Sequence, residues 1–356
     1  NIPVGMVAFF SAWYLLPHFP TQNKPFDTGG FFLAAGGFAG LLLGISNAPV
    51  YGWNSFEEIE IFIFSIFALG LFVLWEARQV VPLFDLHILH LRYYTGAIIV
   101  TLFTMMGLFG VLYLVPVFLE TIVHLGSMHT GIALIPLVIG AAVGIPLSGI
   151  LLPRIGATVL TVSGLIIMGI ATLHLSGMGP VWNAGWLYRW MSIIGFGLGI
   201  GVMPAVMVAY SSLPVNWMNQ GSAMLNLVRQ VGSALGVAIL TTVLQMNEPV
   251  YHSQLAGSFT PGSLISQQWL SKLQQIAYMA GMTAGQGHRW ALTYIAQWIK
   301  QTAMMWAFHD DFVVAALLIF LGIIPGLFLL GYRQFLRQIK FKEKKKPYRA
   351  IDAAKG

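Results

Sequence analysis

Nine stretches of this chain are continuously apolar over about the length that a helix needs to cross a lipid bilayer. Crossing the hydrocarbon core takes roughly 20 apolar residues in helical form. The stretches are continuous rather than alternating, which favours helices over the strands of a membrane barrel. The expected spans, of which the first is short, are about 3–17, 29–47, 59–76, 94–119, 130–152, 156–176, 186–209, 221–245 and 312–332.

The scarcity of charge supports the same interpretation. Charged residues make up 8% of the chain and hydrophobic residues 57%, whereas soluble proteins carry about 25% charged residues. Such a chain cannot cover its outer surface with charged groups that water solvates. We therefore expect this surface to contact membrane lipid. The net charge of +6 does not indicate nucleic-acid binding, because nine of the 18 Lys and Arg lie in residues 333–356. We therefore expect an all-α, polytopic membrane protein that binds no nucleic acid.

The distribution of basic residues predicts the orientation. Counting the connections alternately places 13 Lys and Arg on one side and 4 on the other, and Arg229 falls inside a span. Cytoplasmic connections are enriched in Lys and Arg. We therefore expect a protein of the inner membrane whose C-terminus lies in the cytoplasm. The chain begins with Asn1 rather than Met, and an outside start requires an odd number of preceding spans. We therefore expect a fragment of a longer protein.

Two segments outside the spans have a distinctive composition. The basic tail is expected to bind anionic lipid as a topology anchor. The long connection 246–306 contains two amphipathic stretches. One interpretation is that both stretches lie in the membrane interface with their Trp side toward the lipid. The other is that they dock a periplasmic partner, and both can hold together. The recurring apolar positions are Ile265, Trp269, Leu273, Ile276 and Ala280, then Trp290, Tyr294, Trp298 and Trp306.

A series of short motifs follows in a fixed order along the whole chain. They are Asn1–Gly5 (N-x-P-x-G), Asp27–Gly30 (D-x-x-G), Pro82–Leu86 (P-L-x-D-L), Gly131–Pro136 with Pro146–Gly149, residues 219–240 (NQGSAMLNLVRQVGSALGVAIL), and Gln301–Phe312 with Asp310. In this order they resemble the major facilitator superfamily, specifically its 14-helix drug:proton antiporter group of the EmrB/QacA type. One departure is Pro153, which stands where the group often has the acid of D-R-x-G before Gly156.

The resemblance implies a division of the chain into helices 6 to 14 of that group. It gives the last helix of the first six-helix half (1–20), two linker helices with a cytoplasmic link (21–92), helices 9–13 of the second half (93–245), a periplasmic amphipathic connection (246–306), the last helix (307–333) and a basic cytoplasmic tail (334–356). The first five helices, which carry the group's known proton-coupling acids, would be absent.

The resemblance also implies a function. It implies alternating access, in which inward proton flow drives export of an apolar or cationic small molecule without a cofactor. The long connection 246–306 points to the tripartite version of such an exporter, with a periplasmic adaptor and an outer-membrane channel as partners. Two alternatives stay open: a superfamily importer of a small nutrient, and a membrane scaffold that transports nothing. Enzyme signatures such as G-x-S-x-G and H-E-x-x-H do not occur in the sequence, so we expect a transporter and not an enzyme.

The candidate substrate pathway is a polar stripe in the span 221–245. Its members are spaced three or four residues apart and so share one helix face: Asn226, Arg229, Gln230 and Ser233. A charge inside a span costs on the order of 2.5–3.5 kcal/mol on insertion scales, which makes Arg229 a functional candidate. The alternative is an arginine that snorkels to the cytoplasmic surface.

Other candidates lie on neighbouring spans. Glu120 is expected to be either a solvated helix-end acid or a proton-binding acid at an outer gate, and Tyr113 to line an apolar cavity. Two groups of small residues are expected to allow close helix packing: Gly195, Gly197, Gly199, Gly201 and Pro204 in one span, and Gly232 and Gly236 in another. An alternative for the group 195–204 is a flexible half-helix that gates the pathway. Two histidine groups receive structural interpretations. His87 and His90 are expected in a cytoplasmic link. His309 with Asp310 and Asp311 is expected at a helix start, where acids interact favourably with the helix dipole. No metal site is expected.

Overall fold

The computed structural model describes residues 2–15, 27–79, 85–181, 183–260 and 263–329, and these form helices and their connections without a β-strand. This agrees with the predicted all-α class. The α-helices are α1 (Ile2–Leu15), α2 (Thr28–Tyr51), α3 (Phe56–Glu76), α4 (Arg92–Thr121), α5 (Ser127–Ile155), α6 (Ala157–Leu175), α7 (Ala184–Ser211), α8 (Met218–Ser258), α9 (Leu264–Met279), α10 (Ala284–Leu321) and α11 (Ile323–Leu327). Two short 3₁₀ helices, η1 (Leu86–His90) and η2 (Val215–Trp217), precede α4 and α8.

Eight helices in the described part of the chain are long and apolar enough to cross a membrane. They correspond to the expected spans from 29–47 onward, and α11 continues the last of them. The first expected span appears as α1, whose 14 residues fall short of the others. Several expectations lie outside the described residues: Asn1, the proline-rich connection within 16–26, Pro82 to Phe84, and the basic tail 334–356.

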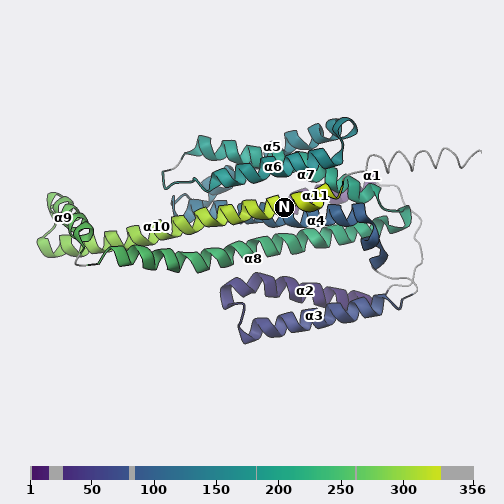
Figure 1. Cartoon of the computed structure of the whole chain (residues 1–356), viewed down its shortest axis with the longest axis horizontal. Coiled ribbons are helices and arrows are strands. Elements are labelled where there is room, and N and C mark those ends of the chain that lie inside the picture. Colours follow the sequence, from purple (N-terminus) through teal and green to yellow (C-terminus); the bar gives the residue numbers. More distant parts are fainter. Residues whose placement is uncertain (1, 16–26, 80–84, 182, 261–262, 330–356) are drawn as a thin grey trace, which may run out of the picture.

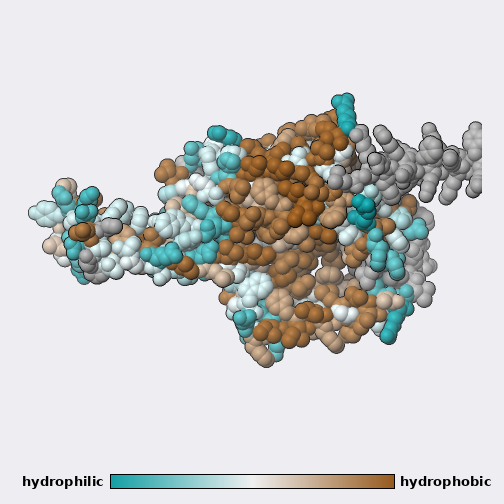
Figure 2. Space-filling view, viewed as in Figure 1, coloured by the Kyte–Doolittle hydropathy of each residue, from teal (hydrophilic) through white to brown (hydrophobic). Residues whose placement is uncertain are grey.

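Six helices, α4 to α8 and α10, form the main bundle (Figure 1). The most extensive contacts join α7 to α5 and α6 on one side, and α4 to α8 and α10 on the other. Figure 2 shows the consequence of this arrangement, because apolar side chains cover a broad band across the bundle. Since a bilayer offers this band an apolar solvent, the fold is that of a multi-pass membrane protein.

The α2–α3 hairpin packs beside α8 as a separate layer (Figure 1). Asp27 caps α2 by accepting a hydrogen bond from the Gly30 amide at 2.9 Å, and the indole of Trp75 at the end of α3 donates to the same carboxylate at 3.1 Å. At the opposite end of the hairpin, the Trp53 indole donates to the Thr242 hydroxyl of α8 at 2.9 Å. The last bond ties the hairpin to the bundle.

Alternate glycines on α7 contact two different neighbours. A Cβ on Gly195 would lie 1.8 Å from the carbonyl oxygen of Leu137 on α5, and Gly199 faces the same helix. A Cβ on Gly197 or Gly201 would instead meet the Gly164 backbone of α6. Spacing of four residues within each pair puts one pair on each face of α7, so these glycines let three helix backbones approach closely.

The connection between α5 and α6 consists of one residue. Gly156 adopts a φ of +97°, which side chains with a Cβ rarely tolerate, and its amide donates to the Leu152 carbonyl. This explains how Arg154 and Gly156 turn the chain back on itself without a longer loop.

The described residues of 246–306, which we call the stalk, differ from the expectation of helices lying flat in the interface. α8 continues without interruption to Ser258, and α10 begins at Ala284 and runs straight into its apolar part. A helix that crosses a membrane cannot also lie in its plane, so Trp290 to Trp306 follow the axis of the span. Figure 1 shows α8 and α10 extending past the bundle with α9 at the far end, and Figure 2 shows that this extension is mostly pale to teal, in contrast to the brown band of the bundle.

Candidate functional site

A cavity of about 560 Å³ lies between α2, α4 and α8. Most of its lining is aliphatic or aromatic, with a few hydroxyl and amide groups. Such a composition suits an apolar ligand that is oriented by a small number of polar contacts. Its lining comprises Leu42, Leu43, Ser46, Pro49, Val50, Phe109, Tyr113, Gln230, Ser233, Ala234, Val237, Ala238 and Thr241.

Helical spacing explains which side chains reach this cavity. On α8, Gln230, Ser233, Val237 and Thr241 recur every three or four residues and so form one face. The Ser233 hydroxyl donates to the carbonyl oxygen of Gln230 at 2.8 Å, which satisfies its proton within the helix. Gln230 is exposed, and its side-chain amide is one of the polar groups at the cavity wall.

The structure brings together three of the six predicted pathway residues. Tyr113, Gln230 and Ser233 line the cavity, whereas Asn226 and Arg229 do not belong to its lining. Arg229 is partly buried, and its Nε has no hydrogen-bond partner among the described residues. Glu120 is exposed near the end of α4. Its location agrees with a solvated helix-end acid and leaves an outer-gate role as a hypothesis.

The two glycines predicted on α8 lie against α4. A Cβ on Gly236 would stand 2.0 Å from the Met106 carbonyl oxygen, and one on Gly232 would stand 2.9 Å from that of Leu102. These contacts set the distance between the two helices that carry most of the cavity wall. Pro204 is buried within α7, beyond the glycines that contact α5 and α6.

A second hollow of about 500 Å³ lies along the same α2–α8 interface. It is lined by Phe31, Ala34, Ala35 and Phe38 of α2 and by Asn219, Gln220, Ala223 and Leu227 of α8. The α2–α8 interface is therefore hollowed on either side of residues 227–230. The sequence pattern predicted the α8 face of this interface and missed its α2 face, since α2 carries almost no polar residues that would mark it.

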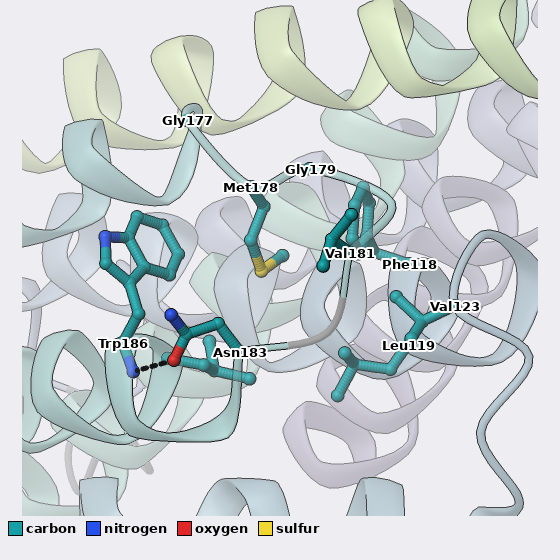
Figure 3. Close-up of a pocket in the computed structure, with 10 residues that line it drawn as sticks. Phe118, Leu119, Val123, Gly177, Met178, Gly179, Val181, Asn183 and Trp186 are labelled. Carbon is teal, nitrogen blue, oxygen red and sulfur yellow. Dashed lines mark hydrogen bonds between the residues drawn. The ribbon is translucent and has the colours of Figure 1, made fainter.

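A smaller cavity of about 210 Å³ lies at the stalk end of the bundle (Figure 3). Phe118 and Leu119 of α4 line it together with Met178, Asn183 and Trp186 around the α6–α7 connection. Asn183 caps α7 by accepting a hydrogen bond from the Trp186 amide at 3.0 Å. The cavity is too small for a drug-sized ligand, for which sites of about 300–1,000 Å³ are usual.

Three buried acids among the described residues were not singled out as sites by the sequence reasoning, and one of them, Glu76 at the end of α3, is 4% exposed. Glu58 of α3 is 1% exposed, and Asp311 of α10 is fully buried. Asp311 had been interpreted as part of a helix start, but α10 begins at Ala284, so Asp311 lies far past the first turn. The signal that could have found it is an ionisable residue at the edge of an apolar span.

Comparison with known proteins found relatives but no matching family model. The chain is 25% identical over 353 residues to an uncharacterised MFS-type transporter, YhcA, of Bacillus subtilis, covering 97% of this chain and 64% of that protein. It is 28% identical over 252 residues to a multidrug resistance protein B homologue of Mycobacterium tuberculosis (68% and 46%). It is 25% identical over 258 residues to the lincomycin resistance protein LmrB of Listeria innocua (72% and 55%).

The chain is therefore similar to an MFS-type transporter and to proteins named for drug resistance. The similarity to the Bacillus protein extends over nearly the whole chain, so it includes the main bundle, the α2–α3 hairpin and the stalk. The chain spans between about half and two thirds of the length of these relatives.

Proposed function

We propose that this chain belongs to a secondary active transporter that exports drug-like or toxic small molecules. The observation that carries the proposal is the cavity between α2, α4 and α8, whose wall is apolar with few polar groups. Importers of sugars or acids require many polar contacts, and this wall offers few. The names of the relatives, a multidrug resistance homologue and a lincomycin resistance protein, agree with export.

The finer assignment rests on the ordered motifs. We propose that the chain corresponds to helices 6 to 14 of a 14-helix drug:proton antiporter in the inner membrane, with a cytoplasmic C-terminus. In that arrangement α2 and α3 are the two linker helices, and α4 to α8 with α10 are the second six-helix half. Protons flowing inward drive export, and the two halves alternate access to a site near the middle of the membrane.

The experiment that tests export fills the cavity. Ala234 lines it from α8, and Ala234→Trp places a large ring in the space a substrate needs. Ala39→Trp on α2 is a matched control, because Ala39 is exposed and lines neither hollow of the α2–α8 interface. In a host lacking its own efflux pumps, Ala234→Trp in the complete transporter should lower drug resistance and Ala39→Trp should not. Equal resistance of both variants at equal expression, or drug uptake in place of export, contradicts the proposal.

We also propose that the stalk docks a periplasmic adaptor that leads to an outer-membrane channel. A hydrophilic extension of two spans, capped by α9, is suited to reach a partner outside the bilayer. Because the chain has no Cys, Gln267→Cys on α9 provides a single crosslinking position, with the exposed Ile63→Cys of α3 as control. Crosslinking to a co-expressed adaptor from Gln267→Cys alone supports docking. No product, or equal product from both positions, counts against it.

A further inference from the structure

Two adjacent carboxylates on α10 have opposite surroundings. Asp310 accepts hydrogen bonds from two side chains of α8, the Tyr251 hydroxyl at 2.5 Å and the Asn247 amide at 3.2 Å. Asp311 is fully buried, and neither of its oxygens has a hydrogen-bond partner among the described residues. One acid is therefore solvated by protein donors, and its neighbour is not.

An ionised Asp311 would be costly in these surroundings. Phe308, Phe312 and Ala315, which lie on the same side of α10, are all fully buried. Moving an ionised carboxylate into apolar surroundings without donors costs far more than moving a neutral acid. The charge of Asp310 next to it adds repulsion.

The helices packed against α10 supply no counter-charge. Their titratable side chains are Arg92, Tyr93, Tyr94, Tyr113 and Glu120 on α4, His174 on α6, Arg229, Glu248, Tyr251 and His252 on α8, and Lys272 and Tyr278 on α9; α11 has none. None of them pairs with Asp311 in the part of the chain that the structure describes. On α10 itself, His309, two residues before Asp311, donates from Nε2 to the Met178 carbonyl oxygen at 2.9 Å instead.

We propose that Asp311 is a proton-binding site, occupied by a proton in this conformation and held beside an ionised Asp310. Tyr251 and Asn247 stabilise the negative charge on Asp310 by donating to it, so the charge of the pair stays on the residue with donors. The proton on Asp311 leaves when water reaches the side chain: its O–H bond breaks, the electron pair stays on the carboxylate, and the proton transfers to water.

A route for that water begins at the cavity of Figure 3. Phe118 and Met178, which line it, both contact α10 just before Asp311. The Phe118 ring packs edge-on against Phe308 with centroids 5.3 Å apart, and the Met178 carbonyl accepts from His309. Movement of α10 away from α4 at Phe118 would connect this cavity to Asp311. A role of this step in driving export rests on the proposed function, whereas the binding of the proton does not.

The test is modification by dicyclohexylcarbodiimide, an apolar reagent that selects protonated acids in apolar surroundings. The acid oxygen adds to the central carbon of the carbodiimide, the acid proton moves to a nitrogen, and an acyl shift leaves a stable N-acylurea. The full chain in detergent micelles is treated at about pH 7, where an ordinary Asp is almost entirely ionised. Mass spectrometry of the peptides then locates and quantifies the adduct.

We expect modification at Asp311 to exceed that at Asp310 and at the exposed Glu120 by at least about tenfold, the ratio that one pH unit of difference in proton affinity produces. Asp311→Asn should abolish the adduct, and Glu120→Gln should leave it unchanged. Because Asp311→Asn could fold poorly, the wild-type chain is also examined by infrared spectroscopy. A carbonyl band of a protonated acid near neutral pH, shifted in D₂O and still present when Glu58 and Glu76 are changed to Gln, supports the site.

Modification at Asp311 no greater than at Glu120, or absence of that carbonyl band, overturns the inference. Neither measurement uses a drug or a proton gradient. A failure of drug export would therefore contradict the proposed function without affecting the proton site. A failure of labelling would contradict the proton site without affecting the proposed function.

Discussion

Gly236 of α8 lies so close to Met106 of α4 that a Cβ on the glycine would stand 2.0 Å from the Met106 carbonyl oxygen. Backbone meets backbone at this point, so neither helix can yield by turning a side chain. Together with Gly232 against Leu102, this contact fixes the spacing of the two helices that form most of the cavity wall.

Gly236→Ala is therefore expected to destabilise the chain by about 1–3 kcal/mol through overpacking. Gly149→Ala is the matched control, because no atom lies within 4 Å of a Cβ at that position of α5. Alanine favours a helix over glycine by about 1 kcal/mol, so the control should be neutral or slightly stabilising. The measurement is the temperature at which each variant loses its monodisperse peak in detergent; equal shifts for both would contradict the packing argument.

The hydrogen bond from Trp53 to Thr242 predicts a local effect on the α2–α3 hairpin. Thr242→Val removes the acceptor of the indole N–H and should weaken this contact by about 1 kcal/mol. Amide hydrogen exchange in residues 51–56 should then become faster. Thr241→Val is the control, since the Thr241 hydroxyl bonds only within α8, to the Val237 carbonyl. Unchanged exchange in Thr242→Val would show that the hairpin does not depend on this bond.

The stalk offers two tryptophans on one helix with different contacts. Trp298 packs on Trp269 of α9 and on Phe259 at the end of α8, with ring centroids 5.9 and 5.6 Å apart. Trp290 stacks on Tyr294 of its own helix. Trp298→Ala should release α9 and increase proteolytic cleavage between residues 258 and 284, because an aromatic pair contributes about 0.5–1.5 kcal/mol beyond its buried area. Trp290→Ala should cleave like the wild type, and the reverse order would refute this assignment.

Arg229 gives a prediction about transport. It is a charged residue inside a span, partly buried, with an Nε that no described residue accepts from. Charges are rarely retained in spans without a function, so Arg229→Ala in the complete transporter should lower drug resistance several-fold. Arg189→Ala is the control, because Arg189 is exposed near the start of α7. Unchanged resistance of Arg229→Ala at normal expression would remove this residue from the mechanism.

Particular elements show how far sequence reasoning reached. The spans α2 to α8 were predicted to within several residues at most ends, since apolar runs of bilayer length and turn residues such as Gly156 mark them directly. The expected last span, 312–332, coincides with the end of α10 and with α11, but the helix that carries it begins at Ala284 and not near residue 312. A helix continues through polar sequence when nothing breaks it and a neighbour, here α8 and α9, packs against it. The same error led to the interpretation of Asp311 as a helix-start acid.

By itself, the sequence determined that the chain is a helical membrane protein, because too few charges and too many long apolar runs leave no other way to satisfy the backbone. It also determined the helix faces, since residues three and four apart share a side. Only the tertiary structure decided which faces meet. The position of Gln230 and Tyr113 at one cavity, the two neighbours of the α7 glycines and the isolation of Asp311 all depend on contacts between residues far apart in the chain, which no local pattern records.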